Sequence, residues 1–199
     1  MQLLVATRNA GKIRELADML ADIKVEWLSL DDIAVTHEVA ETGSTFEENA
    51  ILKANEYAKK SQLLTLADDS GLEVDALGGR PGVHTARYGG PMLTSEQRYQ
   101  LLLDELVNVP QGKRTARFRC VVAISRPGGL VGTSEGVCEG VIAMRPAGDG
   151  GFGYDPIFYI PKRAKTMAEL PAYVKQQISH RGQAFARITP LLRQLLAAA

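Results

Sequence analysis

The sequence predicts an α/β protein, because strand-like apolar runs and helical periodicities follow one another along the chain. Residues 3–6 form a short apolar run, and after a polar loop the apolar residues Ile13, Leu16, Ala17 and Leu20 recur at helical spacing. A second apolar run, residues 63–67, is followed by two adjacent carboxylates, Asp68 and Asp69. Ligands in open α/β sheets collect at strand ends, so this acidic segment is the first candidate site.

The acidic segment has two interpretations. Ser70 and Gly71 follow the acids and are predicted to end the strand. A buried carboxylate pair is costly in free energy unless it holds a cation or a proton, which favours a functional site. A surface turn is the alternative, because Asp, Ser and Gly are ordinary turn residues.

A polar loop with a glycine, Thr7-Arg8-Asn9-Ala10-Gly11-Lys12, joins the first predicted strand to a helix. The free backbone N–H groups and the dipole at a helix N-terminus favour phosphate, and Lys12 adds a positive charge. The loop is not a Walker loop, because Ile13 rather than Ser or Thr follows Lys12. The alternative is an ordinary helix start capped near Asn9.

The next elements are a strand at residues 25–28, a polar loop at residues 31–41 and a helix at about 46–60. Thr45 and Glu48 have the spacing of a capping box at the start of that helix. The nearby acids Glu41, Glu47 and Glu48 are candidate metal or water ligands. For Glu47 and Glu48, the simpler interpretation is that they complement the helix dipole.

Further elements are predicted along the second half of the chain. They are a strand at 72–77, a turn at 78–82, a Thr94-capped helix to about 106, a hairpin of 116–124 and 130–144 joined at 126–129, a weak helix at 165–177 broken at Pro171, and a last helix opening at 178–182.

Two later segments carry chemistry. Residues 148–156 combine four glycines with Phe152 and Tyr154, and aromatic faces suit a nucleobase, although a Gly-rich hairpin loop is the alternative. Lys175, His180 and Arg181 place three cationic or donor groups within seven residues. Considered alone, these three residues favour a solvated helix boundary over a binding site.

Composition narrows the classes of function. The 199 residues suit a single domain spanning residues 1–199, and 23 basic residues balance 23 acidic ones, which argues against nucleic-acid or anionic-membrane binding. No apolar run is long enough to span a membrane. Cys120 and Cys138 are predicted to be reduced core thiols, so we expect a cytoplasmic protein. The histidines and cysteines do not have the spacing of a zinc site, so any bound metal should be a hard cation with oxygen ligands.

Five motifs in order resemble the inosine triphosphate pyrophosphatase family, and together they cover essentially the whole chain. They are Thr7–Lys12, which looks like the family's T-x-N-x-G-K phosphate loop, and the segments 41–50, 66–72, 151–156 and 179–182. The resemblance implies an elongated mixed β-sheet flanked by helices, with two lobes, an active-site cleft between them, and a homodimer.

The resemblance also implies Mg2+-dependent hydrolysis of dITP, ITP and XTP to the monophosphate and pyrophosphate, which would cleanse the nucleotide pool. Asp69 resembles the proton acceptor and a metal contact, and Glu41 a further acid near the metal. The substrate contacts that the family implies are Thr7, Arg8, Asn9, Ala10, Gly11, Lys12 and Ser70 for phosphate, and Phe152, Gly153, Tyr154, Asp155, Lys175, His180 and Arg181 for the base.

A non-catalytic nucleotide-binding sensor is the alternative function. We expect Asp68 and Asp69 to distinguish the hydrolase from the sensor. A protein that only binds a triphosphate gains nothing from carboxylates beside the phosphates unless a metal lies between them.

Overall fold

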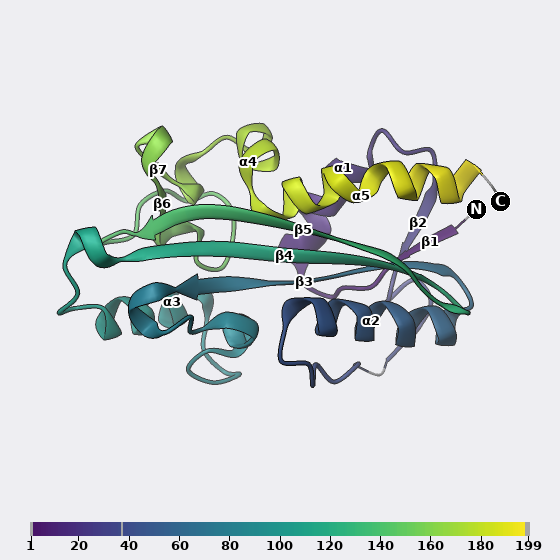
Figure 1. Cartoon of the computed structure of the whole chain (residues 1–199), viewed down its shortest axis with the longest axis horizontal. Coiled ribbons are helices and arrows are strands. Elements are labelled where there is room, and N and C mark those ends of the chain that lie inside the picture. The colour runs from purple at the N-terminus through teal and green to yellow at the C-terminus, as the bar shows by residue number, and fades with distance from the viewer. Residues whose placement is uncertain (1, 37, 198–199) are drawn as a thin grey trace. The chain divides into compact units, whose positions relative to one another are not determined.

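The computed structural model describes residues 2–36 and 38–197 and has a mixed α/β architecture (Figure 1). Its sheet has the strand order β2-β1-β3-β4-β5-β6-β7. β1 is parallel to both of its neighbours, β2 and β3, whereas β6 is antiparallel to β5 and β7. The predicted α/β class with a mixed sheet is therefore confirmed. The strands are β1 (Gln2–Val5), β2 (Glu26–Ser29), β3 (Leu64–Val74), β4 (Thr115–Arg126), β5 (Gly129–Ile142), β6 (Phe158–Ile160) and β7 (Lys165–Thr166).

The helices begin where the sequence predicts capping. Thr45 and Thr94 each form a capping box, at the starts of α2 and α3. Pro171 precedes α4, as the predicted break requires. In the part of the chain that the structure describes, no helix is both long and apolar enough to cross a membrane. The helices are α1 (Ala10–Leu20), α2 (Phe46–Ser61), α3 (Ser95–Glu105), α4 (Ala172–Ile178) and α5 (His180–Ala197).

The chain divides into two compact units, each built from separate segments. Unit 1 contains the residues up to Asp69, Cys120–Gly136, and those from Arg181 onward. Unit 2 contains Ser70–Arg119 and Val137–His180. Each unit has its own cluster of buried apolar side chains.

The core of unit 1 lies between strands and helices. Leu16 and Leu20 of α1 and Phe185 of α5 pack against Leu3 and Leu66 of the strands. Helix α2 lies on the other side of these strands (Figure 1). It buries small side chains at helical spacing, including Ala50, Ala54 and Ala58.

The core of unit 2 combines α3 with the ends of the long strands. Leu102 and Leu106 of α3 belong to the same cluster as Leu72 and Phe118. Phe158 is also buried there, and its ring centroid lies 4.3 Å from that of Phe118. This core supports the Gly-rich segment, because Tyr154 is one of its members.

Three predicted boundaries are wrong. Ser70 and Gly71 do not end a strand, because β3 continues to Val74. Gly71 lies in the extended backbone of a buried strand, where no turn forms. The predicted strand at 72–77 is therefore the end of β3 followed by a short 3-10 turn, Asp75–Leu77. Residues 165–166 form β7 rather than the start of a weak helix.

The predicted loop at 31–41 has neither helix nor strand among its described residues. His37, within this segment, lies outside the described residues.

Candidate active site

Strand β3 carries both Asp68 and Asp69 in its interior rather than at its end. Successive side chains of a strand point to opposite faces, so the two neighbours have different hydrogen-bond partners. Asp68 is 2% exposed and Asp69 is 5% exposed, so the surface-turn interpretation is wrong. The two acids form two separate sites inside unit 1, one facing α1 and α5 and the other facing α2.

Asp68 is surrounded by cations. Its Oδ2 lies 2.9 Å from Nζ of Lys12 and 3.3 Å from Nη2 of Arg181. The Cys120 thiol also donates to Oδ2, at 3.6 Å. Burial alone would raise the pKa of Asp68, but the nearby cations, chiefly Lys12 and Arg181, outweigh it and hold the pKa well below its ordinary value. The two cations therefore favour the ionised form of Asp68, which in turn pairs with both of them.

Asp69 faces two polar residues of α2. Its Oδ1 accepts from Nζ of Lys53 and its Oδ2 from Nδ2 of Asn49, both at 3.2 Å. Burial raises the pKa of Asp69, and the ammonium groups of Lys53 and Lys12 only partly offset this effect. The net pKa is above the ordinary value, which suits a group that accepts a proton.

Lys53 is the central residue that the sequence did not predict. Its Nζ lies 2.6 Å from Oε1 of Glu41 as well as 3.2 Å from Asp69, so one ammonium group joins two candidate metal ligands. Burial lowers the pKa of Lys53, but three nearby acids, Asp69 first and then Glu41 and Asp68, raise it above its ordinary value. Asn49 and Lys53 are four residues apart on one face of α2, and this spacing was the available signal.

These pairs change the argument about the sensor alternative. The protein itself supplies cations to both buried acids, Lys12 and Arg181 to Asp68 and Lys53 to Asp69. The carboxylates therefore do not by themselves require a metal. A measurement of turnover is therefore needed to distinguish a hydrolase from a sensor.

The predicted phosphate loop, Thr7–Lys12, follows β1 and continues into the first turn of α1. Oδ1 of Asn9 accepts from the backbone N–H groups of Gly11, at 2.9 Å, and Lys12, at 3.1 Å. Asn9 is therefore the helix cap, as the alternative interpretation expected. Thr7 accepts a hydrogen bond from the backbone N–H of Asn9, and Arg8 donates to the backbone carbonyl of Val35. Ala10 begins the helix.

The other two acids near α2 are engaged elsewhere. Glu48 accepts from the backbone N–H groups of Ser44 and Thr45, which completes the predicted capping box. Glu47 accepts from the hydroxyl of Thr133, at 3.0 Å. These contacts support the simpler interpretation of both residues at the helix start.

Unit 2 gathers most of the residues predicted to contact the base. Oδ2 of Asp155 lies 2.5 Å from Nζ of Lys175 and accepts from the backbone N–H of Phe152 at 2.7 Å. The Lys175 ammonium is 4.9 Å from the centroid of the Phe152 ring. Gly153 has φ of 62°, in the left-handed region that favours glycine.

The remaining predicted contacts are more dispersed. The hydroxyl of Tyr154 donates to the backbone carbonyl of Thr85, and the His180 ring stacks on Phe118 at a centroid distance of 4.8 Å. Ser70 is half-buried in β3. Arg181 belongs to unit 1, where it pairs with Asp68 and, at 2.5 Å, with Glu15. The structure thus groups Arg181 with Lys12 rather than with Lys175.

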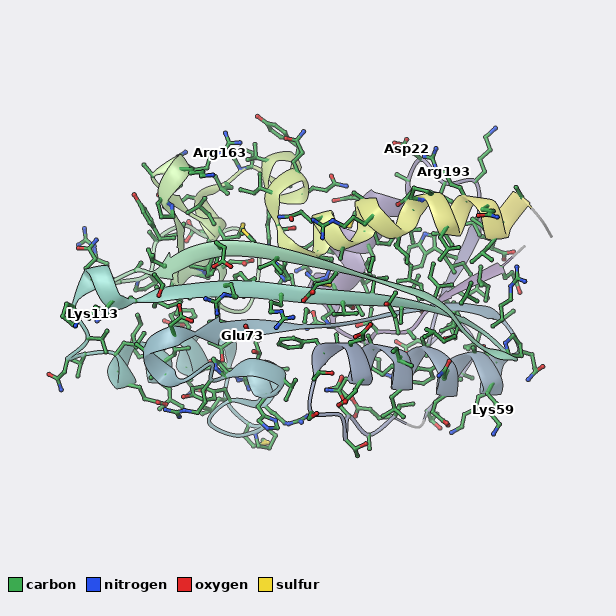
Figure 2. The ribbon with its side chains drawn as sticks, in the orientation of Figure 1. Asp22, Lys59, Glu73, Lys113, Arg163 and Arg193 are labelled. Atoms are coloured by element: carbon green, nitrogen blue, oxygen red, sulfur yellow. The ribbon has the colours of Figure 1, made fainter. Side chains whose placement is uncertain are left out.

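Arg181→Met is expected to lower the free energy of unfolding by about 3 kcal/mol, because it leaves Asp68 and Glu15 with less compensation in a buried site. Lys12 remains beside Asp68, so the loss should be at the lower end of the range for broken buried pairs. Guanidinium denaturation measures the effect. Arg193→Met is the control, since Arg193 is an exposed residue of the same helix (labelled in Figure 2). Equal stability of the two variants would contradict this account.

Comparison with known proteins places the chain among close relatives. The sequence profile of the Ham1 family matches residues 3–191. A "dITP/XTP pyrophosphatase" of Geobacillus kaustophilus (strain HTA426) is 51% identical over 187 residues, covering 94% of this chain and 92% of that protein. One of Bacillus subtilis (strain 168) is 47% identical over 189 residues, with 95% and 96% covered.

Solved structures agree with the sequence comparison. A HAM1 protein from Coxiella burnetii superposes with a TM-score of 0.88 at 40% identity, covering 98% of this chain and 99% of that one. The Ham1 protein of Staphylococcus aureus gives a TM-score of 0.84 at 41% identity, with 100% and 99% covered. The family resemblance of the five motifs is thereby confirmed: the chain belongs to the Ham1 family.

Proposed function

We propose that this protein hydrolyses the non-canonical purine nucleotides dITP, ITP and XTP to the nucleoside monophosphate and pyrophosphate. Relatives that are about half identical over nearly their whole length carry the name dITP/XTP pyrophosphatase. The structural observation that carries the proposal is the position of Asp69, which is buried in β3 beside Asn49 and Lys53 of α2, while Lys53 also pairs with Glu41. Burial prevails at Asp69 and raises its pKa, whereas cations prevail at Asp68 and lower its pKa.

Asp69 is the proposed proton acceptor. A general base near neutral pH works best when its pKa lies above that of an ordinary carboxyl group. The water oxygen bonds to the α-phosphorus, the bond from this phosphorus to the bridging oxygen breaks, and the water proton passes to Asp69. Asp68 cannot take this role, because its low pKa makes it a very weak base.

Glu41 and Asp69 are the proposed ligands of Mg2+. Both carboxylates already face one cationic group, Nζ of Lys53, so their oxygens converge on a position that favours positive charge. Within residues 2–36 and 38–197, no three His, Cys, Asp or Glu side chains form a metal-binding group. The two carboxylates suit Mg2+, which binds through one or two carboxylates plus phosphates and waters. The ion would neutralise charge on the phosphate oxygens.

The residues Thr7–Lys12 and Ser70 are proposed to hold the triphosphate. Lys12 contributes a positive charge at the start of α1, and the dipole of that helix favours an anion there. In unit 2, Phe152 offers a ring face for stacking, and Lys175 and His180 offer hydrogen-bond donors. Gly153, Tyr154, Asp155 and Arg181 complete the proposed substrate contacts.

The direct test is pyrophosphate release from dITP with Mg2+, compared with the same assay after EDTA is added in excess. Turnover that requires Mg2+ is expected. Tight binding of dITP without any pyrophosphate release would favour the sensor alternative.

Lys12→Ala is expected to lower kcat/KM for every triphosphate, because one charge-assisted contact to phosphate is lost. The loss corresponds to about 1.5–3 kcal/mol of transition-state stabilisation. The ratio of dITP to dATP efficiency should stay the same, since all nucleotides share the phosphates. Lys24→Ala, which removes an exposed lysine of unit 1, is the control. A changed base preference in Lys12→Ala would contradict the assignment of Lys12 to phosphate.

We further propose a homodimer, as the family resemblance implies. The cysteines and the chain length support the proposal of a cytoplasmic location and one functional domain for residues 1–199. Light scattering is expected to give about twice the chain mass of 21.6 kDa. A mass equal to one chain at every concentration would rule out the dimer.

A further inference from the structure

A buried ion pair in unit 2 lies against an aromatic ring. The side chains of Lys175 and Asp155 are 9% and 4% exposed, and Nζ lies 2.5 Å from Oδ2. The same Oδ2 accepts from the backbone N–H of Phe152 at 2.7 Å, and the ammonium is 4.9 Å from the Phe152 ring centroid. One carboxylate oxygen therefore fixes both the cation and the backbone of the residue that carries the ring.

The chain at Gly151 is shaped around this pair. Gly151 has φ of 72°, and a Cβ built there would lie 2.0 Å from Oδ2 of Asp155 and 3.0 Å from Nζ of Lys175. A side chain at this position would push the pair apart, and the left-handed backbone disfavours one as well. Glycine thus permits the closest approach of the loop to the two charges.

We propose that Asp155, besides its proposed contact with the substrate, acts through Lys175 as a positioning residue and sets the preference between hypoxanthine and xanthine nucleotides. The inference rests on the proposed function, in which Lys175 and Phe152 contact the base. Asp155 holds Lys175 beside the ring as a hydrogen-bond donor and, at the same time, neutralises its charge.

The two bases differ in a way that responds to this charge. Hypoxanthine is neutral near neutral pH, whereas the second oxo group of xanthine makes its ring acidic, so that part of it is an anion. An anionic base is stabilised by a net positive site, and the effect is strong where water is excluded. Because the Asp155 carboxylate lies 2.5 Å from its ammonium, Lys175 adds little net charge to the site, so the wild-type site does not specially favour the xanthine anion.

The experiment compares ITP with XTP, because these share the ribose and the phosphates and differ only at position 2 of the base. The kcat/KM of both substrates is measured from mildly acidic to mildly alkaline pH in wild type, Asp155→Asn and Asp149→Asn. Asp149 is an exposed carboxylate of the same Gly-rich segment, so its variant makes the same change in charge away from the pair. Thermal denaturation establishes that each variant is folded.

Asp155→Asn is expected to raise the XTP-to-ITP efficiency ratio about tenfold over wild type, because Lys175 is left with its full charge. The increase should grow as pH rises, since a larger fraction of xanthine is then ionised. A purely structural loss would lower both efficiencies and leave the ratio and its pH profile unchanged. Asp149→Asn should keep the wild-type ratio.

A wild-type ratio in a folded Asp155→Asn variant would overturn the inference, as would an equal rise in Asp149→Asn. If Asp155→Asn does not fold, the double variant Asp155→Asn/Lys175→Met, which has no charge at either position, is measured instead. Its ratio should stay near that of wild type at every pH, and a tenfold rise towards XTP would overturn the inference. Wild type that hydrolyses neither substrate would contradict the proposed function itself.

Discussion

The purified protein is expected to hydrolyse dITP about 10⁴–10⁵-fold more efficiently than dATP, measured as kcat/KM. Hypoxanthine presents a 6-oxo acceptor, whereas adenine presents a 6-amino donor. Lysine and arginine side chains can only donate, so adenine leaves buried donors facing a donor. A site built for a hydrogen bond rejects the mismatched analogue strongly, because its polar groups remain unpaired.

The three predicted donors, Lys175, His180 and Arg181, have different surroundings in the structure. Lys175 lies beside Phe152, and His180 belongs to the same unit. Arg181 is bonded to Asp68 and Glu15 in unit 1. We therefore expect Lys175→Met to reduce the dITP-to-dATP ratio, while Arg181→Met acts first on stability.

Lys162→Met is the control for this experiment, because Lys162 is an exposed lysine of the same unit. Including dGTP as a substrate separates selection at position 6 of the base from selection elsewhere on it. Guanine shares the 6-oxo group, so these donors cannot reject it. Equal efficiency of wild type on dATP and dITP would refute selection by donors.

Asp69→Asn is expected to reduce kcat about 10²–10⁴-fold, because the amide cannot accept the proton of the attacking water. The side chains have nearly the same shape, so the fold should persist. Some stability should be lost, since the new amide group presents a donor to either Asn49 or Lys53, which are themselves donors here. That loss is about 1–3 kcal/mol for an unpaired buried group.

Circular dichroism and single-turnover kinetics separate the two effects. Asp68→Asn is the informative companion, because Asp68 has the opposite electrostatic character and should affect stability more than proton transfer. Wild-type kcat in a folded Asp69→Asn variant would remove Asp69 from the reaction.

Local signals in the sequence predicted most of the fold. The capping boxes at Thr45 and Thr94, the break at Pro171 and the order of strands and helices all depend on residues close in sequence, and the structure confirms them. The end of β3 was misplaced because Ser70 and Gly71 read as turn residues. A strand with neighbours on both sides overrides such a local preference, since its backbone groups are paired across the sheet.

The environments of the candidate site could be predicted only in part. Alternation along a strand separates Asp68 from Asp69 once the strand is known to continue, and helical spacing places Lys53 with Asn49. The partners themselves come from distant parts of the chain. Arg181 is 113 residues from Asp68, and nothing local to either residue identifies the other.

The discontinuous make-up of unit 1 has a consequence for its synthesis. Leu3 and Leu16 share a core with Ile188 and Leu192 of α5, which the ribosome makes only after all of unit 2. The first strands and helices therefore emerge without the surface that buries them. Contacts so far apart in sequence form slowly, and exposed apolar segments favour aggregation in the meantime. Unit 1 can therefore complete its core only after α5 has been synthesised.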